Sequence, residues 1–140
     1  MDSRQHRPSA VTLVAVFLSL AATIALVTGL SLLAPGTRLD RIWTLNPRAY
    51  AAFARGGLAS GVLLLVVCGA AAAAARGLLR RRRWAWALAI GIFGINGLGD
   101  LANLALTRAW LKAGAGMLVA ALFLALLLRA DVRTFFAEPA

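Results

Sequence analysis

Residues 10–34 read AVTLVAVFLSLAATIALVTGLSLLA, a run of 25 residues without a charged side chain. About 20 apolar residues are enough for a helix to cross the hydrocarbon core of a bilayer. The apolar part of a secretory signal peptide is only about 7–15 residues long, so we interpret this run as an uncleaved first transmembrane helix. Pro35-Gly36 follows at once and predicts the end of that helix.

Three further apolar runs have the same character, at about residues 57–75, 84–106 and 111–128. The chain of 140 residues is 61% hydrophobic and 14% charged, whereas a soluble domain has about 25% charged residues. This composition excludes a soluble globular fold and, because hydropathy is high, a disordered chain. We therefore predict an all-α fold in which residues 1–140 form a single integral-membrane domain, a four-helix bundle of four spans.

The basic residues predict how the spans are oriented. The chain has 15 Lys+Arg against 5 Asp+Glu, a formal net charge of +10. With four spans, nine basic residues lie on the side that holds both termini and the loop between the second and third spans, and six lie on the other side. The positive-inside rule then places both termini in the cytoplasm, as in a multi-pass protein of the cell inner (plasma) membrane.

The run Arg80–Arg83, followed by Trp84 and Trp86, is typical of an anchor at the membrane–water interface. Each arginine near an anionic leaflet contributes about 1 kcal/mol of attraction. The expected partner is the lipid bilayer. Setting the topology explains the run by itself and is the interpretation that we favour, with binding of an anionic lipid at Arg80–Arg83 as the alternative. Nucleic-acid binding is the other common meaning of such a charge. It is not expected, because the arginines lie between apolar spans.

The segment between the first two spans, residues 35–56, predicts two short helices. Thr37-x-x-Asp40 has the spacing of a capping box, with Asp in place of the usual Glu. Asn46-Pro47 places an N-cap residue and an N1 proline before the second helix. Both helices have one apolar face, so the segment is expected to lie on the outer leaflet as an amphipathic connector. A lid over an outward-facing cavity is the alternative.

The C-terminal residues 131–137 predict one more short amphipathic helix. Asp131 stands where an N-cap residue is expected, and Val132, Phe135 and Phe136 share a face at helical spacing. This helix is expected to rest on the inner leaflet.

The third span contains a polar stripe, and hydroxyls in the first two spans lie at a similar depth. The stripe occupies one narrow face of a helix and consists of Asn96, Asp100, Asn103 and Thr107. An ionised carboxylate facing lipid costs at least about 2.5–3.5 kcal/mol, so Asp100 must face the bundle, be protonated or be paired. Hydroxyls that would complete a polar layer in the outer half of the bundle are Thr28, Ser31 and Ser60.

This polar layer has two interpretations. One is a binding site for a proton, a cation or a polar ligand in an outward-opening cavity. The other, which we favour, is a polar clamp between helices, whose bonds contribute about 0.6 kcal/mol each in membranes. The nearest cations include Arg55, Arg108 and Lys112, and a pair with one of them would satisfy Asp100.

Small residues predict close helix packing, because a small side chain lets two backbones approach in lipid. Gly57 and Gly61 form a GxxxG motif at the start of the second span, and the third span contains Gly91, Gly94, Gly97 and Gly99. We expect a tight bundle, or a dimer formed through the second span.

Three stretches resemble segments of small bacterial four-span inner-membrane proteins: PGTRLDRIWTLNP at 35–47, GINGLGDLAN at 94–103 and LRADVRTFF at 128–136. The resemblance implies the same number of spans and implies no activity, substrate or catalytic role. It further implies a set of shared family residues, which are Asp40, Trp43, Asn46, Pro47, Asn96, Asp100 and Asn103.

Composition also limits the chemistry. A single cysteine, Cys68, excludes an internal disulfide or a CxxC pair. A single histidine, His6, leaves too few ligands for a His/Cys metal site, and no cofactor is expected. We expect a non-enzymatic membrane protein with a structural or accessory role, with a second copy or another membrane protein as partner. The alternative is a small transporter or channel subunit that uses Asp100 as its proton, cation or polar-ligand site. An enzyme acting on a lipid or quinone is the weakest hypothesis, because Asp100 has no second catalytic group.

Overall fold

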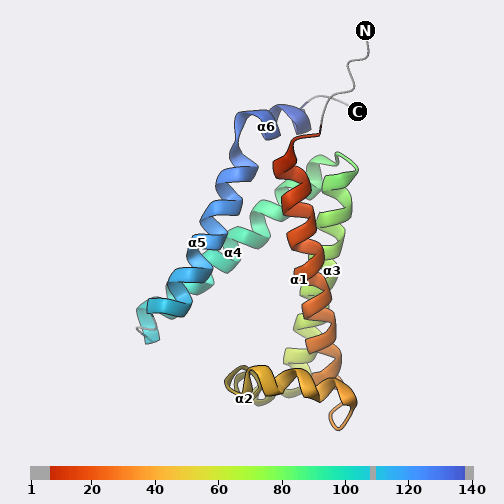
Figure 1. Ribbon diagram of the computed structural model, residues 1–140, viewed down its shortest axis with the longest axis vertical. Helices are drawn as coiled ribbons and strands as arrows, with labels where there is room; N and C mark the ends of the chain where they lie inside the picture. The colour runs from red at the N-terminus through yellow and green to blue at the C-terminus, as the bar shows by residue number, and fades with distance from the viewer. Residues whose placement is uncertain (1–6, 108–109, 138–140) are drawn as a thin grey trace. The chain divides into compact units, whose positions relative to one another are not determined.

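The structure, a computed structural model, describes residues 7–107 and 110–137, with the backbone alone given for 103, 106, 107 and 110–113. Within these ranges the chain is all-α, with seven helices and no strand (Figure 1). In chain order they are α1 (Ser9–Leu33), the 3-10 helix η1 (Arg38–Leu45), α2 (Pro47–Arg55), α3 (Gly57–Leu79), α4 (Arg83–Thr107), α5 (Trp110–Leu128) and α6 (Ala130–Ala137). The all-α prediction is confirmed for this part of the chain.

Among the described residues, three helices are long and apolar enough to cross a membrane: α1, α3 and the part of α4 up to Ala102, with mean hydropathies of 2.6, 2.3 and 1.4. The side chains of α5 are described from Gly114 on, and the segment Gly114–Leu128 counts as a fourth crossing together with α6, which it meets at an angle of 55°. Both ends of α1, the start of α4 and the end of α5 lie within one residue of the expected span limits, whereas the end of α4 and the start of α5 border residues outside the described ranges. Helix α3 is longer than predicted, because it continues through Arg76, a cation that favours the C-terminal end of a helix.

The helices form two compact units, and the division passes through α1 and α3. One unit contains the described residues up to Phe17 together with those from Ala73 onward. Three aromatic rings from α1, α4 and α5 pack together in this unit; Phe93 and Phe123 are buried, and Phe17 is exposed at their edge. Phe93 and Phe123 stack with ring centroids 4.9 Å apart, and Phe17 lies 4.4 Å from Phe123. Such pairs contribute about 0.5–1.5 kcal/mol beyond the area that they bury.

The other unit contains Leu18–Ala72, and α1 and α3 approach closely there through two glycines. A Cβ atom at Gly61 would lie 3.3 Å from the carbonyl oxygen of Gly29 and 2.8 Å from Leu33 Cδ2. The expected role of Gly61 in packing is therefore confirmed. For Gly57 the packing interpretation is wrong: this residue begins α3 with φ +52°, and a Cβ atom there would meet nothing within 4 Å. Gly57 supplies the left-handed backbone of the turn instead.

The two short helices predicted between α1 and α3 are present as η1 and α2. The side chain of Asn46 caps α2 by accepting the N–H of Ala49 at 3.2 Å, and Pro47 occupies the first turn, as predicted. The capping box is wrong in its pairing. The hydroxyl of Thr37 donates to the carbonyl of Ala34 at 3.0 Å. The carboxylate of Asp40 accepts a hydrogen bond from the N–H of Gly36 at 2.7 Å. The first short helix is a 3-10 helix, so its side chains do not follow α-helical register.

Candidate functional site

Of the four residues in the predicted polar stripe, the structure describes the side chains of two, Asn96 and Asp100, both on α4. Asn96 is exposed and Asp100 is half-buried against α5. The Asp100 carboxyl group lies over Gly116: a Cβ atom at that glycine would be 2.7 Å from Asp100 Cγ and 3.1 Å from Oδ1. Gly116 therefore leaves the space that the carboxyl group occupies between the two helices.

The side chains of Asn103 and Thr107 lie outside the described residues, as do those of Arg108 and Lys112. Arg55, another cation considered for Asp100, belongs to the unit of residues 18–72, whereas Asp100 belongs to the other unit. The ion pair of Asp100 stays a prediction.

The three hydroxyls assigned to the same polar layer, Thr28, Ser31 and Ser60, lie in the unit of residues 18–72. The Thr28 hydroxyl donates to the Ile24 carbonyl at 2.6 Å, and that of Ser31 donates to the Thr28 carbonyl at 2.8 Å. Hydroxyls in helices commonly bond in this way to the preceding turn. Ser60 is half-buried and packs against the backbone at Gly56. A common polar layer of these hydroxyls with Asp100 stays a prediction.

Ser31 has a second, structural contact that sequence reasoning missed. It is 1% exposed and accepts a hydrogen bond of 2.9 Å from the indole N–H of Trp43, which is itself 8% exposed. Tyr50 and Phe53 of α2 stand beside the same indole, with ring centroids 5.3 and 6.3 Å away. The buried bond joins η1 to the end of α1 and gives both polar groups a partner, which burial requires.

Two arginines of the run Arg80–Arg83, Arg81 and Arg83, bond to the C-terminal helix α6. Arg81 Nε donates to the carbonyl of Phe135 at 2.6 Å, and its guanidinium carbon lies 4.6 Å from the centre of that ring. Arg83 Nε donates to the carbonyl of Phe136 at 2.7 Å, and a terminal nitrogen of Arg83 donates to that of Ala137. The last carbonyls of a helix have no partner within the helix and carry partial negative charge, so a cationic donor suits them.

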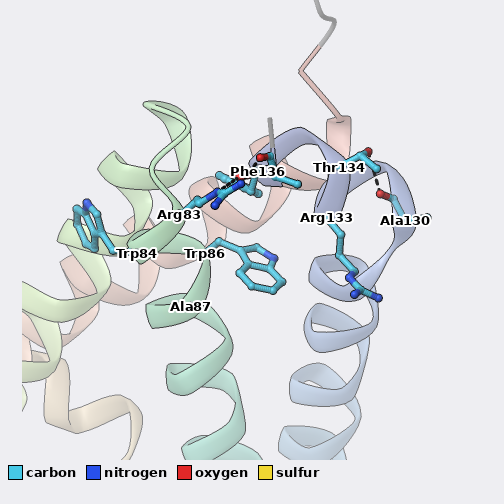
Figure 2. A pocket seen from close by; sticks show the side chains of 9 residues that line it. Arg83, Trp84, Trp86, Ala87, Ala130, Arg133, Thr134 and Phe136 are labelled. Carbon is cyan, nitrogen blue, oxygen red and sulfur yellow. Dashed lines mark hydrogen bonds between the residues drawn. The ribbon is translucent and has the colours of Figure 1, made fainter. Parts of the chain in front are cut away.

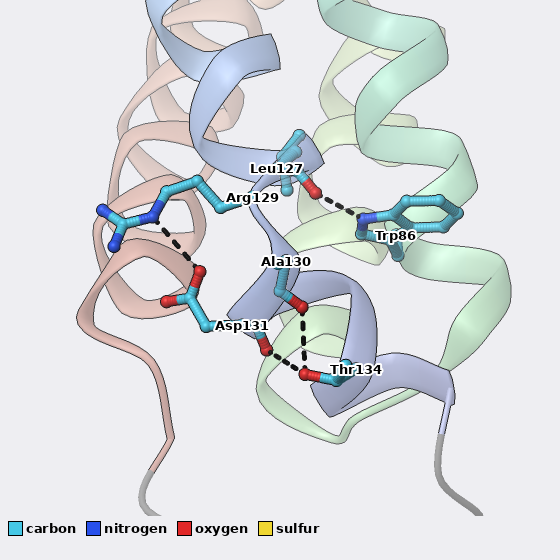
Figure 3. Close-up of polar contacts among 6 residues, drawn as sticks. All are labelled: Trp86, Leu127, Arg129, Ala130, Asp131 and Thr134. Carbon is cyan, nitrogen blue, oxygen red and sulfur yellow. Dashed lines mark hydrogen bonds and ion pairs between the residues drawn. The ribbon is translucent and has the colours of Figure 1, made fainter.

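Two other helix C-termini in the unit that contains α6 also receive hydrogen bonds from side-chain donors. The indole N–H of Trp86 donates to the Leu127 carbonyl at 3.0 Å, at the end of α5 (Figure 3). Arg7 donates to the Leu79 carbonyl at 2.9 Å, at the end of α3. These contacts give basic and aromatic residues a structural role, whereas the sequence suggested only anchoring. The sequence contained one signal for this role: arginine and tryptophan donors cluster near several predicted helix ends, and few carboxylates are present to pair with them.

Helix α6 begins at Ala130, one residue before the cap expected at Asp131. Asp131 therefore lies in the first turn of α6, where its negative charge interacts favourably with the positive end of the helix dipole. Its carboxylate also forms an ion pair with Arg129 at 3.1 Å (Figure 3). Val132 and Phe136 are buried, as the apolar face predicted.

A cleft of about 750 Å³ lies between the start of α4 and α6, within one unit (Figure 2). We call it the α4–α6 cleft. Its lining combines cations with aromatic rings, and the residues that matter below are Arg83, Trp84, Trp86, Arg133, Thr134 and Phe136. A volume of this size is in the range of small-molecule sites.

Among the residues that the structure describes, no group of three or more His, Cys, Asp or Glu side chains is placed to hold a metal ion. Comparison of the chain with models of known protein families, with curated proteins and with solved structures gives no match.

Proposed function

We propose that this chain is a multi-pass protein of a bacterial inner membrane, crossing the bilayer four times with both termini in the cytoplasm. At a rise of 1.5 Å per residue, the 25 residues of α1 extend about 38 Å and the 19 residues of α5 about 29 Å. The hydrocarbon core is about 30 Å thick. Large apolar side chains are exposed on these helices, as with Ile24 at 65% and Leu118 at 72%, and lipid would solvate them.

The bend between α5 and α6 supports α5 as the fourth span and α6 as an interfacial helix. The two segments meet at 55°, and Arg129 stands between them. Arg133 follows on the exposed side of α6, while Val132 and Phe136 are buried. A short helix with this division of faces lies in the interface plane more readily than it continues across hydrocarbon.

Within the membrane we propose a non-enzymatic structural or accessory role, carried by the exposure of Asn96 on α4. An amide on a span is costly when it faces hydrocarbon, and such groups commonly hydrogen-bond to another helix. A helix of a second copy, or of another membrane protein, would supply the partner.

Photocrosslinking in native membranes tests this role. A photoreactive residue at Asn96 is expected to give one discrete protein adduct. The control is Leu98, which is 68% exposed on the same helix and about 200° further around it; a reactive residue there is expected to give lipid adducts. Lipid adducts alone at both positions would contradict the accessory role.

The second candidate is a small transporter or channel subunit, favoured by the half-buried Asp100 carboxyl group between α4 and α5. It predicts a pH-dependent solute or ion flux in liposomes that Asp100→Asn abolishes. Asp131→Asn, which changes an exposed carboxylate on α6, is the matched control and should leave the flux unchanged. An unchanged flux in Asp100→Asn would remove this carboxyl group from the mechanism.

A further inference from the structure

We propose that the α4–α6 cleft binds the phosphate-bearing headgroup of an anionic phospholipid; this inference rests on the membrane insertion proposed above. The sequence suggests the whole run Arg80–Arg83 as a general attractor of anionic lipid. In the structure Arg81 and Arg83 instead donate hydrogen bonds to carbonyls of α6. The remaining cation that lines the cleft is therefore the main candidate for contact with a lipid phosphate.

That remaining cation is Arg133, on the exposed side of α6. Within the described part of the chain its side chain makes no hydrogen bond or ion pair, in contrast to Arg129, which pairs with Asp131. In Figure 2 the Arg133 side chain extends from α6 back along the last turns of α5. A guanidinium group directed along a span lies at headgroup depth rather than in bulk water, and an unpaired cation there needs an anion.

Arg83 provides a second, fixed cation in the lining of the cleft. Its bonds to Phe136 and Ala137 hold the guanidinium group in one orientation. A pre-oriented side chain loses little further entropy on binding. The Nε atom and one terminal nitrogen of Arg83 are used by these carbonyls, so Arg83 offers a phosphate its positive charge and its other terminal nitrogen. Arg133, without a side-chain bond among the described residues, can present the planar donor fork that matches the geometry of phosphate oxygens. One complete fork beside a second fixed positive charge suits a phosphodiester better than it suits a neutral group.

The aromatic lining favours a lipid over a free anion. Trp86 directs its N–H to the Leu127 carbonyl, so its ring is left for apolar contact, and Phe136 lines the same cleft. Tryptophan is enriched at the depth where headgroups meet acyl chains. A cleft of about 750 Å³ has room for a headgroup with its glycerol and the first methylene groups.

Charge selects an anionic lipid over a zwitterionic one. Five of the eight residues from Arg76 to Arg83 are arginines. The nearest described carboxylate on α6 is Asp131, which is occupied by Arg129. The choline or ethanolamine cation of a zwitterionic headgroup would meet this positive field, whereas the glycerol of phosphatidylglycerol adds no positive charge. Phosphatidylglycerol is therefore the probe.

The test is native mass spectrometry of the full chain in a non-ionic detergent. Phosphatidylglycerol and phosphatidylcholine with the same acyl chains are added, and the association constants of the first bound lipid are compared. We expect phosphatidylglycerol to bind at least about tenfold more tightly. Arg133→Gln should reduce this preference about tenfold, the effect of losing charge-assisted hydrogen bonds to the phosphate. Because Arg133 is exposed and makes no side-chain bond within the described residues, this variant should keep its fold, which circular dichroism checks.

Arg80→Gln is the matched control, since Arg80 is exposed and does not line the cleft. It should change the preference less than about twofold. The proposal is overturned if Arg133→Gln keeps the full preference, if Arg80→Gln lowers it equally, or if millimolar inorganic phosphate displaces the lipid. Carbonate extraction of native membranes separates the two proposals. A chain that stays in the membrane without a lipid preference overturns the cleft alone, and a chain that is extracted overturns the membrane assignment.

Discussion

Replacing Arg83 by alanine should loosen α6 without unfolding the rest of the chain. Arg83 is the only side chain described with hydrogen bonds to both of the last two carbonyls of that helix, those of Phe136 and Ala137. Both carbonyls lie in the last turn of α6 as described, where the carbonyls have no partner within the helix. The variant therefore removes two charged donors from a helix end and leaves the apolar contacts of α6 intact.

The size of the effect follows from these contacts. A hydrogen bond contributes about 0.5–1.5 kcal/mol net, and a cation at a helix C-terminus about 0.3–1 kcal/mol. Arg83 is exposed, so water replaces part of what is lost and the lower half of each range applies. The two hydrogen bonds at the lower half of their range contribute about 1–2 kcal/mol together. The cation acts on the helix end through these same bonds, so its contribution is not added, and we expect α6 to open more easily by about 1–2 kcal/mol. At 1.4 kcal/mol per factor of ten, this is about a 5- to 30-fold larger opening constant.

Amide hydrogen exchange followed by mass spectrometry measures this opening directly. Peptides covering α6 (Ala130–Ala137) should exchange about 5- to 30-fold faster in Arg83→Ala, while peptides from the middle of α1 should not change. Arg82→Ala is the control, because Arg82 is the exposed neighbour in the same run. Equal exchange of α6 in Arg83→Ala and the parent chain, or equal acceleration by both variants, would refute the role given to Arg83.

Two further predictions concern buried contacts. Ser31→Ala leaves the indole N–H of Trp43 without its acceptor, which should destabilise the chain by about 1–3 kcal/mol in thermal unfolding; the loss should largely disappear in a Trp43→Phe background, and an equal loss there would contradict the bond. Gly116→Val places a side chain where the Asp100 carboxyl group lies and should lower the unfolding temperature. Gly114→Val, at a glycine with nothing within 4 Å, should not, and equal effects of the two substitutions would argue against this contact.

Local patterns predicted the local structure well. The apolar runs predicted the long helices, and Asn46-Pro47 predicted the start of α2 together with its cap. These features depend on residues within one helical turn of each other, so spacing alone carries the information. The capping-box pattern at Thr37 failed in its pairing, because the carboxylate of Asp40 bonds one residue earlier, at Gly36.

Contacts between distant residues could not be predicted in this way. Arg81 and Arg83 bond to carbonyls 54 and 53 residues further along the chain, and no local spacing indicates such a pairing. Gly57 and Gly61 have the same spacing as a packing motif, yet only Gly61 packs against another helix. The difference is the positive φ of Gly57, which a pattern of small residues does not reveal.

In the candidate site, too, the sequence indicated the polar residues themselves but not the distant residues that they contact. Composition identified Asp100 as the acid of the third span, but the space for its carboxyl group is provided by Gly116 on the next helix. For Ser31, depth along the helix suggested a polar layer, whereas a tryptophan twelve residues later supplies its buried partner. Both partners depend on how elements pack, which the order of residues along one helix does not determine.

Cysteine accessibility in cells tests the four-span topology most directly. In a Cys68→Ala background, single substitutions Thr37→Cys, Arg82→Cys and Ala137→Cys are probed with a membrane-impermeant maleimide. Four crossings with cytoplasmic termini predict labelling at position 37 in intact cells, and labelling at positions 82 and 137 only after the membrane is opened. If α5 does not cross, position 137 is labelled in intact cells together with position 37, and that result would contradict the fourth span.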